Sequence, residues 1–119
     1  TATGFGGITM IDEYRVHTSF TGSVDPVQNF ERSDTATMNF PIGGSGMTES
    51  SGIFTFPSTG IYRIDFYAAA VATGGSSDYM RADIDHTEDN GTYNTASVGY
   101  GGNDANHYCN ISIFSMFDV

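Results

Sequence analysis

Residues 51–70 read SGIFTFPSTGIYRIDFYAAA, and this stretch decides the fold of the chain. Apolar and polar residues alternate on both sides of Pro57, a residue that cannot donate a hydrogen bond within a β-ladder. The segment Pro57–Gly60 is typical of a turn, because proline fixes φ and glycine permits a positive φ. We therefore predict two strands that a tight corner joins into a central hairpin.

The second of these strands has one apolar and one polar face. Its core face holds Tyr62, Ile64, Phe66, Ala68 and Ala70, and its outer face holds Arg63 and Asp65. Arg63 and Asp65, two residues apart, are interpreted as a lateral pair on a surface or interface. We expect buried side chains at Phe54, Tyr62, Phe66, Ile84 and Ile113, and exposed ones at Arg63, Asp65 and Asp83.

Similar alternation recurs along the rest of the chain. The apolar set Ile8, Met10, Tyr14, Val16 and Phe20 predicts a long amphipathic strand or a bulged strand pair. Asn90-Gly91, between the strand of Met80–Ile84 and that of Thr92–Tyr100, is a strong hairpin signal. Other strands are predicted at Val27–Arg32, which places Phe30 in the core, at Met38–Ile42 and at Cys109–Val119. About eight short strands at this spacing indicate a sandwich or jelly roll.

The composition supports an all-β domain. The chain has 119 residues, enough for one domain, with 15 Gly, nine Phe and seven Tyr but no Trp. Leu and Lys are absent, and no long run of good helix formers occurs. We therefore predict a single domain over residues 1–119.

Charge and hydropathy exclude several classes of partner. The formal net charge is −10, and the chain has four Arg and no Lys. This balance argues against nucleic acid or an anionic membrane bound through a basic patch. No stretch approaches the roughly 18 apolar residues of a membrane span, so we expect no membrane insertion.

Both ends of the sequence read as interrupted. Thr1 begins without an initiator Met or a signal peptide, and the last strand is still apolar at Val119. We expect the chain to be truncated at both ends. We also predict that the native sheet holds a strand that this chain lacks, because a buried strand needs partners on both edges.

The ordered set Gly52, Phe54, Pro57, Gly60, Tyr62 and Phe66 resembles the central signature of the C1q/TNF-like jelly roll. A broader resemblance links the chain to a C1q-like module in structural proteins of tailed bacteriophages, marine ones especially. The segments that carry it are GGITMIDEYRV (6–16), Asn29–Arg32, GMTESSGIFTFPSTGIY (46–62), Asp89–Tyr93 and Phe117–Val119. Two departures are the Phe at position 30, commonly Trp in that module, and the end at Val119, where the module usually continues.

The resemblance implies a jelly-roll sandwich of about eight or more antiparallel strands. It also implies a trimeric, non-enzymatic virion domain, a capsid decoration or fibre tip with a role in host attachment. The implied partners are further copies of the chain, other virion proteins and a host surface glycan or receptor. The alternative is a secreted C1q/TNF-like ligand or carbohydrate-binding lectin domain. A collagen-like stalk and a glycan at Asn90, in the pattern Asn90-Gly91-Thr92, would favour that alternative.

The densest acidic cluster lies around the predicted Asn90-Gly91 turn. Asp83, Asp85 and Asp89 are calcium candidates, because oxygen-rich loops hold Ca²⁺ and some C1q-like trimers bind it. The spacing of an EF-hand is missing, and Asp83 and Asp85 fall on a strand. We therefore favour a solvated outer face followed by a turn, and predict no cofactor, with calcium as the alternative.

Histidine and cysteine give no catalytic pattern. His17, His86 and His107 lack metal-ligand spacing, and we assign His17 and His86 to the polar faces of their strands as surface residues. Cys109, the one cysteine, rules out an internal disulfide and reads as a small buried apolar residue. We predict that the chain is not an enzyme. A thiol or metal-dependent enzyme would need a pocket where His, Asp and Cys converge.

Overall fold

The computed structural model describes residues 7–32, 45–72 and 77–119, and within these residues it contains eight strands and no helix. The strands are β1 (Tyr14–Val16), β2 (Phe30–Arg32), β3 (Thr48–Ser50), β4 (Ile53–Thr55), β5 (Ile61–Val71), β6 (Ser77–His86), β7 (Asn94–Asn103) and β8 (Tyr108–Asp118). The predicted all-β class is confirmed. The jelly-roll topology stays a prediction.

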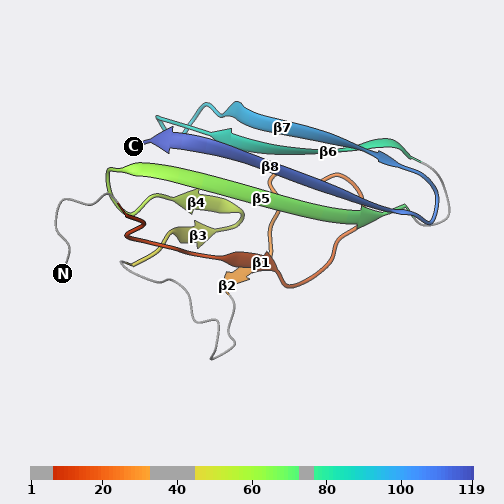
Figure 1. Cartoon of the computed structure of the whole chain (residues 1–119), viewed down its shortest axis with the longest axis horizontal. Coiled ribbons are helices and arrows are strands. Elements are labelled where there is room, and N and C mark those ends of the chain that lie inside the picture. The colour runs from red at the N-terminus through yellow and green to blue at the C-terminus, as the bar shows by residue number, and fades with distance from the viewer. Residues whose placement is uncertain (1–6, 33–44, 73–76) are drawn as a thin grey trace. The chain divides into compact units, whose positions relative to one another are not determined.

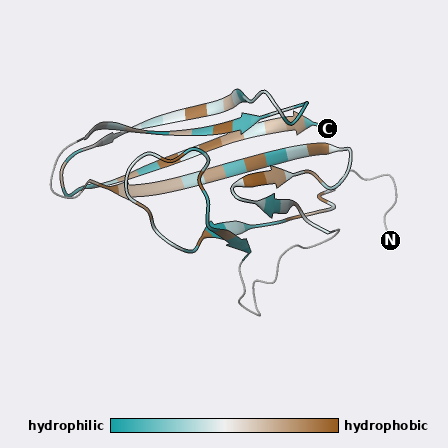
Figure 2. Cartoon of the chain, turned by 180° about the vertical axis from the view of Figure 1, so that it is seen from behind, coloured by the Kyte–Doolittle hydropathy of each residue, from teal (hydrophilic) through white to brown (hydrophobic). Residues whose placement is uncertain are grey.

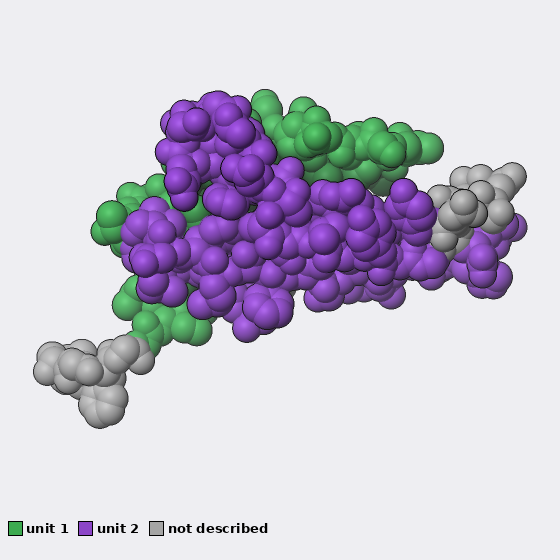
Figure 3. Space-filling view, turned by 90° about the horizontal axis from the view of Figure 1, so that it is seen from above, with its two compact units in different colours: residues 1–59 green, residues 60–119 purple. Residues whose placement is uncertain are grey.

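The four strand pairs of the described residues are antiparallel. β1 pairs with β2, β3 with β4, β5 with β8 and β6 with β7, as can be followed in Figure 1. The contacts divide the chain into two compact units, residues 1–59 and residues 60–119, which Figure 3 draws in different colours. Each unit is described by itself below, and the single domain stays a prediction.

The unit of residues 60–119 is a two-layer sandwich in which the β5–β8 pair faces the β6–β7 pair. Its buried residues are Ala82 of β6 and Cys109, Ile111 and Ile113 of β8, with Phe66, Ala68, Met80 and Ile84 packed around them. Burying such side chains is the dominant favourable term for a sheet pair of this kind. The core therefore lies between the two pairs of long strands.

Glycines of β7 set the spacing between the two layers. A Cβ added to Gly99 would lie 2.6 Å from the Cγ2 atom of Ile113 and 2.7 Å from that of Ile111. A Cβ on Gly101 would meet the Sγ atom of Cys109. Because glycine has no side chain, the branched residues of β8 pack directly against the β7 backbone.

The predicted alternation of β5 is confirmed, and Figure 2 shows its hydrophobic and hydrophilic bands along the strand. Burial is shallower than expected, however. Ile113 is buried at 7% exposure, whereas Phe54, Tyr62, Phe66 and Ile84 are only half-buried. In both units, each sheet of the described residues is two strands wide, so side chains near its edges keep contact with solvent.

The unit of residues 1–59 is built from two short strand pairs. Ser51 and Gly52 form the turn between β3 and β4 with φ values of 51° and 85°. The backbone of Gly52 lies so close to the Val27 carbonyl that no side chain would fit there. The ring of Phe54 contacts the rings of Tyr14 and Phe30 edge-on, each at 5.0 Å between centroids.

Two predictions about strands are wrong. The central hairpin does not form, because β4 pairs with β3 and β5 pairs with β8 instead. The corner at Pro57–Gly60 separates two strands, as predicted, but these two strands pair with different partners. The long N-terminal strand is also wrong: β1 has three residues, and Ile8 and Phe20 are 81% and 48% exposed. Alternation predicts a face, whereas strand length depends on a partner, and β2 supplies only three residues.

Residues 80–119 follow their prediction more closely. β6 and β7 form the expected antiparallel hairpin, although the connection runs from 87 to 93 instead of two residues. Cys109, Ile111 and Ile113 are buried on one face of β8, and Phe117 on the same face is half-buried. The strand predicted at Met38–Ile42 lies outside the described residues.

The β5–β8 sheet is two strands wide along its whole length. At its end, the N–H of Val119 donates to the Gly60 carbonyl at 2.8 Å, and the N–H of Gly60 donates back at 3.0 Å. Among the described residues, no strand pairs with the outer edge of β5 or of β8. That a further strand fills one of these edges stays a prediction.

Candidate functional site

The connection between β6 and β7 is organised by the carboxylate of Asp89. Its Oδ1 atom accepts hydrogen bonds from the N–H groups of Gly91 at 2.8 Å and Thr92 at 2.9 Å, and from the Thr87 hydroxyl at 3.0 Å. These bonds, led by those from the Thr92 and Gly91 backbone, lower the pKa of Asp89 below its ordinary value. Asp89 therefore caps its own loop.

The calcium candidates are not gathered around one point. Asp83 accepts two hydrogen bonds from Arg81, at 2.7 and 2.6 Å, on the outer face of β6. Asp85 lies further along that face, and Asp89 lies in the loop beyond it. In residues 7–32, 45–72 and 77–119, no three His, Cys, Asp or Glu side chains are placed to share a metal ion.

The prediction that His86 is a surface residue is wrong. His86 follows Met80, Ala82 and Ile84 on the core face of β6, so it has the apolar parity of that strand. Its ring lies 5.7 Å from that of Phe117, and its Nδ1 atom is buried without a hydrogen-bond partner. His17 is exposed, as expected, and His107 is exposed as well. Cys109 is 6% exposed, which confirms it as a buried apolar residue.

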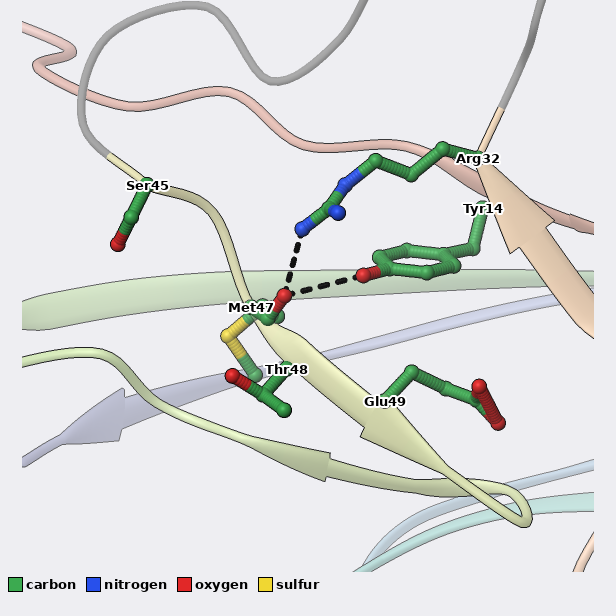
Figure 4. A pocket seen from close by; sticks show the side chains of 6 residues that line it. All are labelled: Tyr14, Arg32, Ser45, Met47, Thr48 and Glu49. Atoms are coloured by element: carbon green, nitrogen blue, oxygen red, sulfur yellow. Dashed lines mark hydrogen bonds between the residues drawn. The ribbon is translucent and has the colours of Figure 1, made fainter.

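A polar network in residues 1–59 joins three segments of the chain. The carboxylate of Asp12, with a side chain only 4% exposed, accepts hydrogen bonds from Arg32 at 2.9 and 3.0 Å. It also accepts one from the Met47 N–H at 2.7 Å. Figure 4 shows Arg32 and Tyr14 both pointing at the Met47 carbonyl, to which they donate at 2.6 and 3.0 Å. The network therefore holds the segment before β3 against β1 and β2.

The network lines an open polar pocket. Its walls are Tyr14, Arg32, Ser45, Met47, Thr48 and Glu49 (Figure 4). Burial, assisted by the charge of Asp12, raises the pKa of Tyr14, and the hydrogen bonds to Asp12 raise the pKa of Arg32. Both side chains therefore stay protonated at neutral pH and act as hydrogen-bond donors within the network. The pocket is explained by this structural role.

The outer face of the β5–β8 sheet carries the largest group of exposed apolar side chains in the described residues. Six large apolar residues on it are between 37% and 80% exposed: Ile61, Tyr67, Val71, Tyr108, Phe114 and Met116. The Arg63–Asp65 pair predicted from the sequence lies among them, with Nη2 and Oδ1 3.1 Å apart. The guanidinium of Arg63 also covers the Phe114 ring at 4.3 Å. This surface, the β5–β8 outer face, has the chemistry of a protein contact.

The signature residues are divided between the two units. Gly52, Phe54 and Pro57 belong to residues 1–59, whereas Gly60, Tyr62 and Phe66 belong to residues 60–119. Their positions are those of turns and half-buried aromatic residues. The structure therefore gives the signature a role in folding.

Among the ion pairs that were not predicted, two had a signal in the sequence. The Asp12–Arg32 pair could have been predicted, because Asp12 interrupts the apolar parity of Met10, Tyr14 and Val16. A carboxylate on the buried face of a strand needs a partner. A signal for Arg81–Asp83 existed as well, since it repeats the Arg-x-Asp spacing of Arg63–Asp65.

Comparison of the chain with protein-family models, curated proteins and solved structures found no match. In the part of the chain that the structure describes, no helix has the length and apolar character needed to cross a membrane.

Proposed function

We propose that this chain is a structural domain of a virion, a C1q-like module that forms a homotrimer and serves as a capsid decoration or fibre tip with a role in host attachment. The observation that carries the proposal is the apolar β5–β8 outer face. It supports self-association, and the number of three copies comes from the resemblance to phage C1q-like modules.

The size of this face supports a contact between folded copies. β5 and β8 each have 11 residues, so the face is about 36 Å long at roughly 3.3 Å per residue. Monomeric proteins rarely expose contiguous apolar patches larger than a few hundred Å². Arg63 is neutralised by Asp65 on the same face, so covering this pair leaves neither of its two charges unpaired, and Asp118, opposite Ile61, is a further carboxylate at the end of the face.

The acidic composition supports display on a particle surface. A net charge of −10 keeps copies apart except where apolar contact outweighs repulsion, and it discourages adhesion to nucleic acid. The module therefore associates through a defined face. Its other partners in the proposal are neighbouring virion proteins and a host surface glycan or receptor.

One observation favours the secreted ligand or lectin as the second candidate. Asn90, Gly91 and Thr92 are all exposed in the loop between β6 and β7, so this acceptor pattern is accessible for a glycan. A glycan found on Asn90 of the native protein would support the secreted alternative.

The test of the virion role is mass spectrometry of particles purified through density gradients and high salt. The proposal predicts the chain at a fixed copy number relative to the major capsid protein, retained after the salt wash. Recovery of the chain only outside particles, or in amounts that vary between preparations, would contradict it.

A further inference from the structure

The outer face of the β6–β7 hairpin presents two tyrosine rings side by side. Tyr79 and Tyr100 are 59% and 60% exposed, with ring centroids 5.6 Å apart and an angle of 62° between planes. Both point away from the core, since Met80 and Ala82 on β6 and Gly99 and Gly101 on β7 face inward. The two rings meet edge to face on paired strands, and both stay exposed.

A fixed ion pair flanks these rings. Arg81 lies directly opposite Tyr100 in the ladder, and its guanidinium is 5.6 Å from that ring. Its Nε and Nη2 atoms donate to the two carboxylate oxygens of Asp83 at 2.7 and 2.6 Å. A bidentate pair of this kind fixes the direction of both groups. Tyr79, Tyr100, Arg81 and Asp83 together are called the tyrosine platform.

The two outer faces of this sandwich differ in chemistry. The β5–β8 outer face carries the exposed aliphatic side chains Ile61, Val71 and Met116 beside its aromatic residues and the Arg63–Asp65 pair, as expected for contact with a second copy. The platform consists of two tyrosine rings and one charged pair without an aliphatic side chain, and Asp85 continues its polar edge. A cross-strand aromatic pair adds only modestly to the stability of a hairpin, so hairpin stability alone is a weak reason to expose two rings.

We propose that the tyrosine platform binds a neutral carbohydrate chain. A pyranose ring has an apolar face of C–H groups that stacks on an aromatic ring, and hydroxyl groups at its edge that bond to polar side chains. Tyr79 and Tyr100 supply the stacking surface for successive sugars. Asp83 accepts and Arg81 donates hydrogen bonds at the edge, in a geometry that their own ion pair holds in place.

Charge selects a neutral glycan over an acidic one. Arg81 is already paired with Asp83, Asp85 lies on the same face, and the whole chain carries a net charge of −10. A sulfated or uronic-acid chain would therefore be repelled. The inference rests on the proposed attachment role, since a displayed domain would meet host glycans, and it names the class of glycan.

The test is saturation-transfer NMR on the whole chain with four probes: cellotetraose, mannotetraose, chitotetraose and the acidic tetragalacturonate. At least one neutral tetramer should show transfer involving the Tyr79 and Tyr100 rings, with affinity independent of salt. Tyr100→Ala and Tyr79→Ala should each weaken this binding by about tenfold or more, as for aromatic residues at the centre of a site. Tyr100→Phe, which keeps the ring, should stay within a few-fold of the original chain.

Tyr93→Ala is the matched control, because Tyr93 is 45% exposed but lies outside the platform. Arg81→Lys keeps the positive charge but loses the two parallel N–H donors of the guanidinium, so it should weaken binding several-fold. The proposal would be overturned if no neutral tetramer binds, or if tetragalacturonate binds more tightly than the neutral tetramers. It would also be overturned if Tyr93→Ala weakens binding as much as Tyr79→Ala and Tyr100→Ala do. Loss of solvent access to both rings as protein concentration rises would also overturn it. The mass of the same samples by light scattering reports self-association separately, so failure here leaves that part of the proposed function intact.

Discussion

Asp12 is a buried charge whose hydrogen bonds to the described residues are made inside its own unit. Its two oxygens accept bonds from Arg32, from the Met47 N–H and from the Glu13 N–H. Asp12→Ala would leave Arg32 without its carboxylate and the Met47 N–H without an acceptor. We expect a loss of about 3 kcal/mol in the free energy of unfolding, the lower end for a broken buried pair, because Arg32 keeps some contact with water.

Urea denaturation checks this value, and Glu13→Ala is the control, since Glu13 is the exposed neighbour. Asp12→Asn should fall between the two, because its amide retains one acceptor oxygen. Equal stability of the Asp12→Ala and Glu13→Ala variants would show that the network does not stabilise residues 1–59.

Asp89 links the order of the β6–β7 loop to pH. Its pKa in the folded chain is lower than the ordinary value of 3.8, so the folded loop favours the ionised form. The corresponding stabilisation is present above pH 3.8 and is lost as pH falls through the lower, folded pKa. The amide shifts of Gly91 and Thr92 should therefore titrate with a midpoint below 3.8.

Two-dimensional NMR between neutral and strongly acid pH measures this midpoint. Asp89→Asn should abolish the transition at Gly91 and Thr92 while leaving the β7 ladder intact. A midpoint at or above the ordinary aspartate value in the original chain would contradict the loop geometry.

At the level of elements, the contact between β7 and β8 depends on glycine. Gly99→Ala would place a methyl group within van der Waals radii of Ile111 and Ile113. Overpacking of this kind should cost about 1–3 kcal/mol in unfolding free energy. Gly102→Ala is the control, because an added Cβ there meets nothing within 4 Å.

Thermal unfolding and urea denaturation of the two variants provide the comparison. Gly99→Ala should have the lower melting temperature by several degrees, whereas Gly102→Ala should stay near the original chain. A Gly99→Ala variant as stable as Gly102→Ala would mean that β7 and β8 are not in close contact.

Sequence patterns predicted the long strands better than the short ones. The alternation of Tyr62–Ala70 and of Cys109–Ile113 repeats over many residues, so it determines which side chains face the core. Pairing partners were harder to predict. The corner at Pro57–Gly60 is compatible with a hairpin, so the local sequence does not show that its two strands pair elsewhere. The pairing of β5 with β8 is set by contacts about 50 residues apart in sequence. The N-terminal pattern from Ile8 to Phe20 has only a three-residue partner strand.

The candidate surfaces were predicted in part. Arg63–Asp65 was predicted because both residues share a strand face at a spacing of two. Asp12–Arg32 and Arg81–Tyr100 join segments distant in sequence, and their contacts depend on strand register, which the local pattern does not determine. His86 was misassigned because the prediction placed it on the polar face of its strand, although it has the parity of Met80, Ala82 and Ile84.

For the whole molecule, the central claim is self-association through the β5–β8 outer face. Phe114 lies in this face at 53% exposure beneath Arg63, so Phe114→Asp would place a carboxylate in the contact. It should dissociate the assembly without unfolding it, because the Phe114 side chain is outside the core. Tyr100→Asp is the control, since Tyr100 lies on the opposite outer face.

The direct measurement is the molar mass of the chain by multi-angle light scattering at micromolar concentration. The account predicts three times 12.7 kDa for the original chain and for Tyr100→Asp, and 12.7 kDa for Phe114→Asp with an unchanged far-ultraviolet circular dichroism spectrum. A mass of 12.7 kDa for the original chain, or a trimer that Phe114→Asp leaves intact, would contradict it.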